Sequence, residues 1–251
     1  MKPSAILSAL ESLTKVKQPV FLWGSPGVGK SNIVAEFAAL SKICLRDVRV
    51  ILLDPVDLRG LPFLGSDGRS KWATLIFRPM TAWALFLDEL NAAPAMVQAS
   101  CYQLVLDRKL GEYILPTGWT IIAAGNRESD HGATTRMPTP LRSRFVHLDF
   151  DVDIQEWSAW AVQSNIRPEV IAFLRFRPVL LNAFDRDTNA FPSPRSWELV
   201  SRIICGGAVS KSSTVNGLNL LVGCSCGQYC RGDALPIMSK EGLPIDIKPG
   251  Q

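Results

Sequence analysis

The segment "FLWGSPGVGKSN" spans residues 21–32. In it a short apolar run gives way to three glycines and a proline, and a lysine and a serine follow. These residues complete the pattern G-x-x-x-x-G-K-[ST]. Glycines at these places let the backbone curl, so that N–H groups point inward at a phosphate in front of a helix. The candidate phosphate-binding residues are therefore Gly24, Ser25, Pro26, Gly27, Val28, Gly29, Lys30 and Ser31.

The sequence around this loop supplies the context that the motif requires. Val20–Trp23 is a brief apolar run and predicts a buried strand, while "SNIVAEFAALSK" after Lys30 has its apolar residues at helical spacing. A strand, a glycine loop and a helix in this order favour phosphate binding over a simple turn. We expect Lys30 to reach the β- and γ-phosphates and Ser31 to hold Mg²⁺.

A second motif, "LFLDEL", contains two adjacent acids at the end of an apolar run. Asp88 is placed to act as a Mg²⁺ partner, and Glu89 to orient an attacking water or accept its proton. A guanine-specific Asn-Lys-x-Asp motif does not occur in the sequence. The expected ligands are therefore ATP and Mg²⁺.

Short apolar strands alternate with helical patterns over residues 1–150, which predicts an α/β core with a parallel sheet flanked by helices, the P-loop NTPase arrangement. The expected strands are 20–23, 48–54, 83–89, two within 112–126, and 144–150, and the expected helices are 4–15, 31–42 and 95–111. A Ser-Asp-Gly turn between apolar arms predicts a hairpin inserted at about 57–78. Residues 151–205 contain three helical patterns and predict a small helical lid, whereas 206–251 form a divergent, irregular tail.

The bulk composition narrows the class of protein. The chain has 251 residues, 47% of them hydrophobic and 20% charged, and its formal net charge is +4. A surplus this small does not favour nucleic acid as the partner. We expect no membrane span or secretory signal, and a cytoplasmic location.

The six cysteines do not match a common metal pattern. Cys44 and Cys101 lie in apolar segments and are expected to be core residues. The cluster Cys224, Cys226 and Cys230 has a C-x-C-x3-C spacing that fits no usual zinc site, and no histidine is near it. Reduced thiols are the favoured interpretation, with a metal or redox cluster as the alternative.

Five motifs in fixed order now carry a resemblance: the phosphate loop, "LFLDELNAAP", "IIAAGN", "TPLRSRF" and "SPRSWELV". Over residues 18–204 the chain resembles an AAA+ ATPase of the MoxR branch, and within it the compact phage-related and bacterial members. The resemblance implies a helical lid, a helix-2 insert at 57–76 and a shortened pre-sensor hairpin in "LGEYILPTGW".

The resemblance also implies roles for single residues. Asn126 corresponds to sensor 1, which helps to place the lytic water beside Glu89. Arg144 corresponds to an arginine finger that reaches the nucleotide of a neighbouring subunit, with Arg142 as its rival. Arg195 corresponds to sensor 2 on the lid. The chain departs from many relatives at Ala92, where those have an arginine, and Arg127 is a possible substitute.

Three functions remain open at this stage. The leading one is a homo-hexameric ring that hydrolyses ATP to remodel or activate a protein client, with a von Willebrand factor A domain protein as the partner type that the resemblance implies. In it, Leu61, Phe63 and Leu64 of the inserted hairpin contact the client, or else pack on the core. The alternatives are a DNA-handling loader or translocase, and a nucleotide sensor with little turnover.

Overall fold

The computed structural model describes residues 1–66, 68–73, 83–110, 113–127, 130, 137–185 and 191–205. The chain divides into two compact units. The first comprises Met1–Ser25 and Gly29–Asp151; in the second, Pro26–Val28 group with the residues from Val152 onward. The predicted tail at 206–251, its three cysteines and residues 74–78 of the predicted insert lie outside the described residues.

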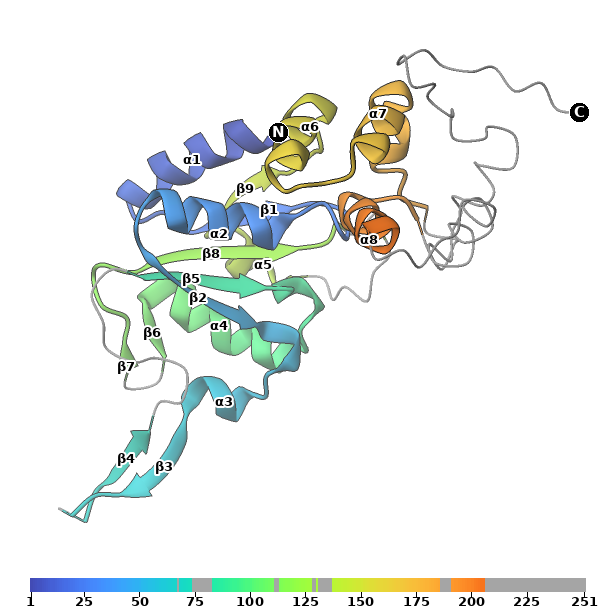
Figure 1. The fold of residues 1–251 in the computed structure, drawn as a ribbon. Helices are drawn as coiled ribbons and strands as arrows, with labels where there is room; N and C mark the ends of the chain where they lie inside the picture. Colours follow the sequence, from blue (N-terminus) through green and yellow to red (C-terminus); the bar gives the residue numbers. More distant parts are fainter. Residues whose placement is uncertain are drawn as a thin grey trace, which may run out of the picture. The chain divides into compact units, whose positions relative to one another are not determined.

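The first unit is built on a five-stranded sheet of order β2-β5-β8-β1-β9, in which every neighbouring pair is parallel (Figure 1). Parallel strands buried on both faces have nearly continuous apolar sequences, which explains why β5 and β8 were readable from the sequence. The predicted α/β fold is confirmed. The strands are β1 Val20–Trp23, β2 Cys44–Arg49, β5 Trp83–Asp88, β8 Thr120–Gly125 and β9 Val146–Asp149.

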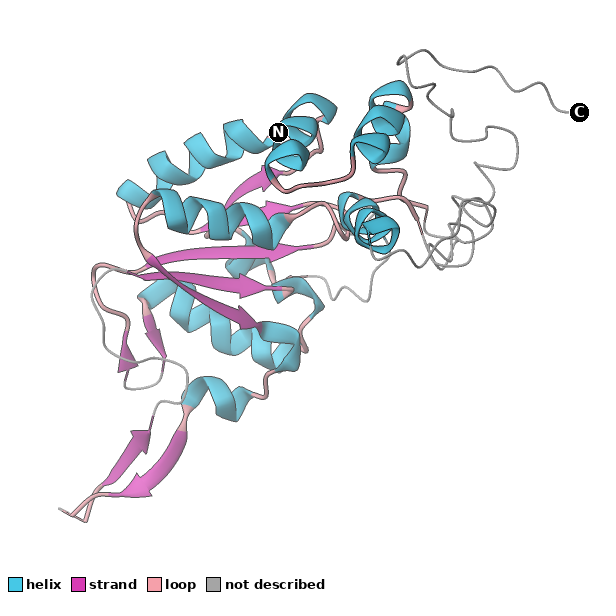
Figure 2. Ribbon diagram, viewed as in Figure 1, coloured by secondary structure: helices cyan, strands magenta, loops and turns pink. Residues whose placement is uncertain are grey.

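Helices cover both faces of this sheet (Figure 2). Helices α1 (Pro3–Lys15) and α2 (Lys30–Leu40) lie on one face, and α4 (Ala95–Asp107) and the short α5 (Thr139–Arg142) on the other. Alternate strand side chains meet α4 and α5 in one buried core, which contains Phe21, Leu85, Leu87, Ile121, Ala123, Val97, Leu104, Leu141 and Phe145. Burying one such side chain stabilises the fold by about 1.5–3 kcal/mol.

The second strand differs from its prediction. The sequence pattern placed it at 48–54, but β2 runs over Cys44–Arg49 and a 3-10 turn follows at Val50–Leu52. This strand lies at the edge of the sheet, and only Val48 of its six residues is buried, so it needs no apolar run. Cys44 is consequently exposed, which corrects the expectation of a core residue. Cys101 is buried as expected, and this burial raises the pKa of its thiol to about 12.

Two small hairpins stand apart from the main sheet. The first follows helix α3 (Pro55–Arg59) and pairs β3 (Leu61–Leu64) with β4 (Ser70–Ala73) in antiparallel fashion, within the range 57–78 where the sequence predicts an inserted hairpin. The second pairs β6 (Lys109–Leu110) with β7 (Tyr113–Ile114). Helix α4 therefore ends before the predicted residue 111, because Arg108 adopts a left-handed conformation with φ 53° and turns the chain into β6.

The second unit is helical in its described part. It contains α6 (Ile154–Gln163), α7 (Pro168–Phe176), a 3-10 turn at Pro178–Leu181 and α8 (Pro194–Cys205). Trp157 belongs to its hydrophobic core, and Trp160 packs against that core. The indole of Trp197 packs beside Phe173 and donates to the carbonyl of Leu180 at 2.7 Å. Among the described helices, none combines the length and apolarity needed to cross a membrane.

Candidate nucleotide-binding site

The glycine loop joins β1 to α2 at the carboxyl edge of the sheet, where open α/β proteins place ligands. Gly27 and Gly29 have φ of 80° and 101°, a region that side-chain-bearing residues rarely enter. Gly29 also caps α2, so the free N–H groups of the first helical turn follow directly after the loop. These N–H groups and the helix dipole favour an anion at this place.

Lys30 is the first residue of α2, and its ammonium group is held inside the loop. It donates to the carbonyls of Gly24 at 2.7 Å and Ser25 at 3.1 Å, and to Oδ1 of Asn126 at 2.9 Å. The ammonium is therefore positioned over the loop without a carboxylate among these three acceptors. A phosphate oxygen is a stronger, charged acceptor for such a donor.

Ser31 and Asp88 come together across the sheet edge. The hydroxyl of Ser31 donates to Oδ2 of Asp88 at 2.9 Å, and the backbone N–H of Glu89 donates to Oδ1 at 3.0 Å. Within the described ranges, no cluster of three or more His, Cys, Asp or Glu side chains could hold a metal by itself. A hydroxyl and a carboxylate are hard oxygen ligands of the kind that Mg²⁺ shares with nucleotide phosphates, so the donor set fits this ion.

Glu89 has an unusual backbone conformation. It follows β5 with φ 56° and ψ 33°, the left-handed region, and its side chain is exposed. A residue with a bulky side chain is uncommon in this region, and such outliers concentrate at functional sites. The turn directs the chain away from the strand immediately after Asp88. As a result, Asp88 is bonded to Ser31, whereas the side chain of Glu89 faces solvent.

Asn126 is supported by Asn91, a residue that the sequence interpretation did not assign. Asn91 is 2% exposed, and its Nδ2 donates to the carbonyl of Asn126 at 2.7 Å. The backbone approaches closely here: a Cβ on Gly125 would lie 2.1 Å from Oδ1 of Asn91. A polar residue inside the apolar stretch "LNAA" was the available signal. Asn91 thus connects the turn after Glu89 to the residue that accepts from Lys30.

Asp47 is a second unassigned residue near the acidic pair. It lies on β2, whose Arg49 is in register with Asp88 of β5. Asp47 is exposed at the surface, but partial desolvation by its neighbours, and then the nearby charge of Asp88, raise its pKa, whereas Arg49 opposes the shift. The region around Asp88 is therefore an acidic one, which favours a cation.

The arginines of "TPLRSRF" lie at the end of α5. Arg144 is exposed and Arg142 is half-buried, and neither guanidinium has an ion pair with another described residue. Arg127 behaves differently: it pairs with Asp151 at 2.7 Å and with Asp149 at 3.4 Å. The hydrogen bond to Asp151 is the main cause that raises the pKa of Arg127. This arginine is already neutralised, so it is a poor substitute for the cation absent at Ala92.

Arg195 is near the start of α8 in the second unit. Its backbone N–H donates to the carbonyl of Gly27, which groups with this unit, at 3.2 Å. Ser193 before it and Ser196 after it close a local hydrogen-bonded turn, in which the N–H of Ser193 donates to Oγ of Ser196 at 2.8 Å. The helix start that bears Arg195 is therefore fixed by local bonds.

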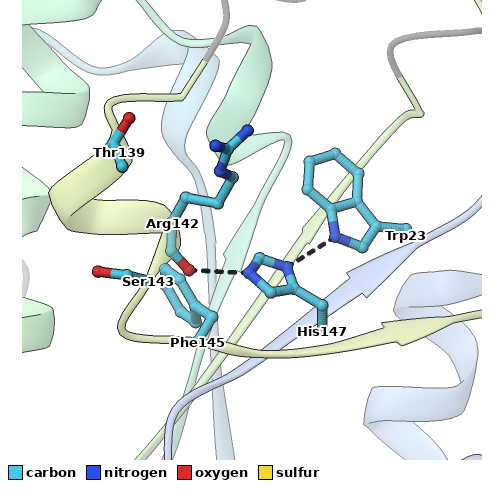
Figure 3. Close-up of a pocket in the computed structure, with 6 residues that line it drawn as sticks. All are labelled: Trp23, Thr139, Arg142, Ser143, Phe145 and His147. Carbon is cyan, nitrogen blue, oxygen red and sulfur yellow. Dashed lines mark hydrogen bonds between the residues drawn. The ribbon is translucent and has the colours of Figure 1, made fainter.

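A pocket of about 540 Å³ opens beside α5, lined by Trp23, Thr139, Arg142, Ser143, Phe145 and His147. Figure 3 shows the ring of His147 between the indole of Trp23 and the carbonyl of Arg142. No short motif marks this arrangement, because its residues come from β1, from β9, and from α5 with the turn after it. The sequence interpretation therefore did not identify it.

The parallel sheet, the glycine loop and the Ser31–Asp88 pair define a P-loop NTPase. The model of the AAA domain (dynein-related subfamily) matches residues 19–145, and the chain belongs to this family. The expected AAA+ assignment is thereby confirmed at the level of the class.

Known proteins agree with this class. Midasin of Giardia intestinalis is 27% identical over an alignment of 187 residues that covers 68% of this chain. The chain spans 4% of the length of that relative. Among solved structures, the Thermotoga maritima RuvB Holliday junction branch migration motor shares the fold with a TM-score of 0.52 and 18% identity, over 96% of this chain and 71% of that one.

Proposed function

We propose that this chain is an ATPase of the MoxR type that hydrolyses ATP in an oligomeric ring and uses the cycle to remodel or activate a protein client. The observation that carries the proposal is the convergence of Lys30, Ser31, Asp88 and Asn126 at one edge of the sheet, with Glu89 beside them. Phosphoryl transfer depends mainly on positioning and charge compensation, and these residue types provide both.

The chain's own residues divide the work. The loop N–H groups and the ammonium of Lys30 bind the phosphates and compensate their charge. Ser31 and Asp88 would hold Mg²⁺, which supplies further charge compensation on the phosphate oxygens when bound. Glu89 orients the attacking water and takes its proton, and Asn126 positions that water. Asn126 can do so only if it stays in place, which its bond from Asn91 supports.

The arginine finger comes from a neighbouring subunit. Arg144 is exposed and without an ion pair to a described residue, as a group offered to a neighbour must be, and Arg142 is its half-buried rival. A finger supplied in trans is worth about 10³–10⁵ in rate in GTPases. The ring, expected to be a homo-hexamer, therefore makes hydrolysis depend on assembly. Arg195 acts as sensor 2 from the second unit.

The hairpin β3–β4 is the proposed client contact. Phe63 is 50% exposed and Leu64 74% exposed, so neither packs on the core, and Trp72 is 39% exposed on the opposite strand. A two-stranded hairpin with exposed apolar residues is marginal alone in water and gains from a partner. A protein client, with a von Willebrand factor A domain protein as first candidate, fits an apolar contact better than nucleic acid does.

The test combines assembly with turnover. The protein is sized with and without a slowly hydrolysed ATP analogue, and ATPase is measured on the same sample. We expect a nucleotide-dependent ring whose specific activity rises with protein concentration. A monomer that hydrolyses at full rate under saturating Mg-ATP would refute the ring, and negligible turnover at every concentration would favour a nucleotide sensor.

Variants then assign the roles. Lys30→Ala should lose nucleotide binding, whereas Glu89→Gln should bind ATP, stop turnover and keep the assembly together. Arg144→Ala should bind normally yet fail to hydrolyse, and a mixture with Glu89→Gln should recover activity. Arg142→Ala run in parallel decides between the two arginines. No recovery with either variant would contradict a finger in trans.

The client contact has its own experiment. Phe63→Asp should keep ATPase activity and assembly and lose action on the client, because Phe63 lies outside the core. Loss of folding in Phe63→Asp would contradict the contact. Tight DNA binding at physiological salt would instead favour a DNA-handling role, of the kind that the name of the RuvB motor states for that protein.

A further inference from the structure

His147 is bonded on both of its ring nitrogens. The indole Nε1 of Trp23 donates to Nδ1 at 2.8 Å, and Nε2 lies 2.8 Å from the carbonyl oxygen of Arg142 (Figure 3). The Trp23 and His147 rings are also stacked, with centroids 5.9 Å apart and planes 23° from parallel.

The two partners determine the tautomer of His147. An indole N–H can only donate, so Nδ1 must accept and carries no proton. A carbonyl can only accept, so Nε2 must carry the proton and donate. Both bonds therefore form together only in the neutral Nε2–H imidazole. The opposite tautomer would lose both of them.

Trp23, which donates to His147, is held rigidly by the sheet. Trp23 is the last residue of β1, in register with Gly125 on one side and Asp149 on the other. Its carbonyl accepts from the N–H of Phe150 at 2.7 Å. The next residue, Gly24, accepts from the ammonium of Lys30. Trp23 is thus fixed to the sheet at the entrance of the phosphate loop.

The Arg142 end of this connection needs support. Helix α5 has four residues, too few for its last carbonyls to find partners within the helix. From the residues that the structure describes, the Arg142 carbonyl receives a long bond of 3.4 Å from the N–H of Phe145, in addition to the bond from His147. Residues 142–145, the arginine turn, contain both candidate fingers.

We propose that His147, in its Nε2–H form, is a positioning residue that ties the arginine turn to the strand entering the subunit's own phosphate loop. This inference rests on the proposed function, because it gives the turn its role as a donor of the finger. The hydrogen bonds of His147 to Trp23 and to the Arg142 carbonyl, which together we call the tie, thus connect a subunit's own phosphate loop to the arginine that it offers to its neighbour. His147 is not one of the proposed nucleotide-binding residues, so its loss should affect the neighbour's hydrolysis and not the subunit's own binding.

The first measurement tests the tie without any activity. The protein contains two histidines, and ¹⁵N spectra of the full chain, assigned with the variant His131→Asn, report which ring nitrogen of His147 is protonated. We expect an unprotonated Nδ1 and a protonated Nε2 at about pH 8. Trp23→Phe, which keeps a ring and removes the donor, should convert this into a mixture of tautomers. A mixture or an Nδ1–H form in the unmodified chain would overturn the tie.

The second measurement tests the consequence. His147→Leu should lower ATPase by about 2- to 13-fold, the equivalent of one net hydrogen bond, and leave the affinity for the ATP analogue unchanged. Adding Trp23→Phe to His147→Leu should cause no further loss, because both variants remove the same tie. Thr139→Val, a change in the same pocket that leaves both bonds of His147 in place, is the matched control and should behave like the unmodified chain.

Mixing experiments separate positioning from general damage. A mixture of His147→Leu with Glu89→Gln should hydrolyse faster than the average of the two, because Glu89→Gln subunits offer an intact arginine turn. A mixture of His147→Leu with Arg144→Ala should not recover. Two outcomes would overturn the inference. One is a loss of affinity for the ATP analogue in His147→Leu. The other is that Arg144→Ala recovers activity when it is mixed with Glu89→Gln, whereas His147→Leu does not. If Arg142→Ala and Arg144→Ala both fail to recover with Glu89→Gln, the ring mechanism itself fails, and the tautomer measurement still decides the tie.

Discussion

Gly125→Ala tests the close approach at the centre of the site. The added methyl carbon would lie 2.1 Å from Oδ1 and 2.7 Å from Cγ of Asn91, and 2.8 Å from Cζ of Phe21. All three distances are shorter than a methyl carbon tolerates. Asn91 and Phe21 are both buried, so neither side chain can move into solvent. The backbone or Asn91 must therefore shift.

The expected loss in the free energy of unfolding has two parts. Overpacking a buried position costs about 1–3 kcal/mol. Displacing Asn91 also breaks its hydrogen bond to the carbonyl of Asn126, and a buried group left without a partner costs about 1–3 kcal/mol. We expect Gly125→Ala to lower the free energy of unfolding by about 2–6 kcal/mol, a large share of the 5–15 kcal/mol that is usual for native proteins.

The assay is urea unfolding followed by circular dichroism, with and without Asn91→Ala. Removing the amide side chain takes away the 2.1 Å and 2.7 Å contacts but not the one with Phe21, so the cost of Gly125→Ala should fall by about 1–3 kcal/mol in that background without vanishing. ATP turnover should stay low in the double variant, because Asn126 has lost its support. A cost of Gly125→Ala below about 0.5 kcal/mol, or the same cost in both backgrounds, would refute this reasoning.

Two further predictions concern charge. Arg127→Leu should destabilise the chain by about 1 kcal/mol or less at neutral pH, since Asp151 is largely exposed. Arg127 lowers the pKa of Asp151 in the folded state, so the pair stabilises the fold at pH values above the unfolded pKa of about 4. The difference in stability between variant and parent should disappear as the pH falls through the lower folded pKa. A difference that persists there would contradict the pairing. Asp47→Asn should stabilise the chain by a few tenths of a kcal/mol at neutral pH, because partial desolvation and the charge of Asp88 raise the pKa of Asp47, so ionisation weakens folding. This gain should fade as the pH falls from the raised folded pKa towards the unfolded pKa of about 4, and should be absent well below that value, where the carboxyl is protonated in both states; thermal unfolding across pH measures it.

The sequence by itself determined the class of fold and the local chemistry of the site. A phosphate loop is a contiguous motif whose glycines, lysine and serine act through neighbouring backbone, so it can be recognised without tertiary information. The strands buried on both faces, such as β5 and β8, were also recognisable from their continuous apolar runs. Asp88 was assigned as a Mg²⁺ partner from its place at the end of an apolar run, whereas the role of Asn126 came only from the resemblance to AAA+ ATPases.

Only the tertiary structure decided the features that depend on which strands are neighbours. The edge position of β2 freed it from an apolar pattern, so its bounds and the exposure of Cys44 could not be inferred from periodicity. The bond from Trp23 to His147 joins residues 124 positions apart, and no sequence period reports such a pair. A local pattern records what one segment buries, whereas these bonds depend on the order in which segments are laid side by side.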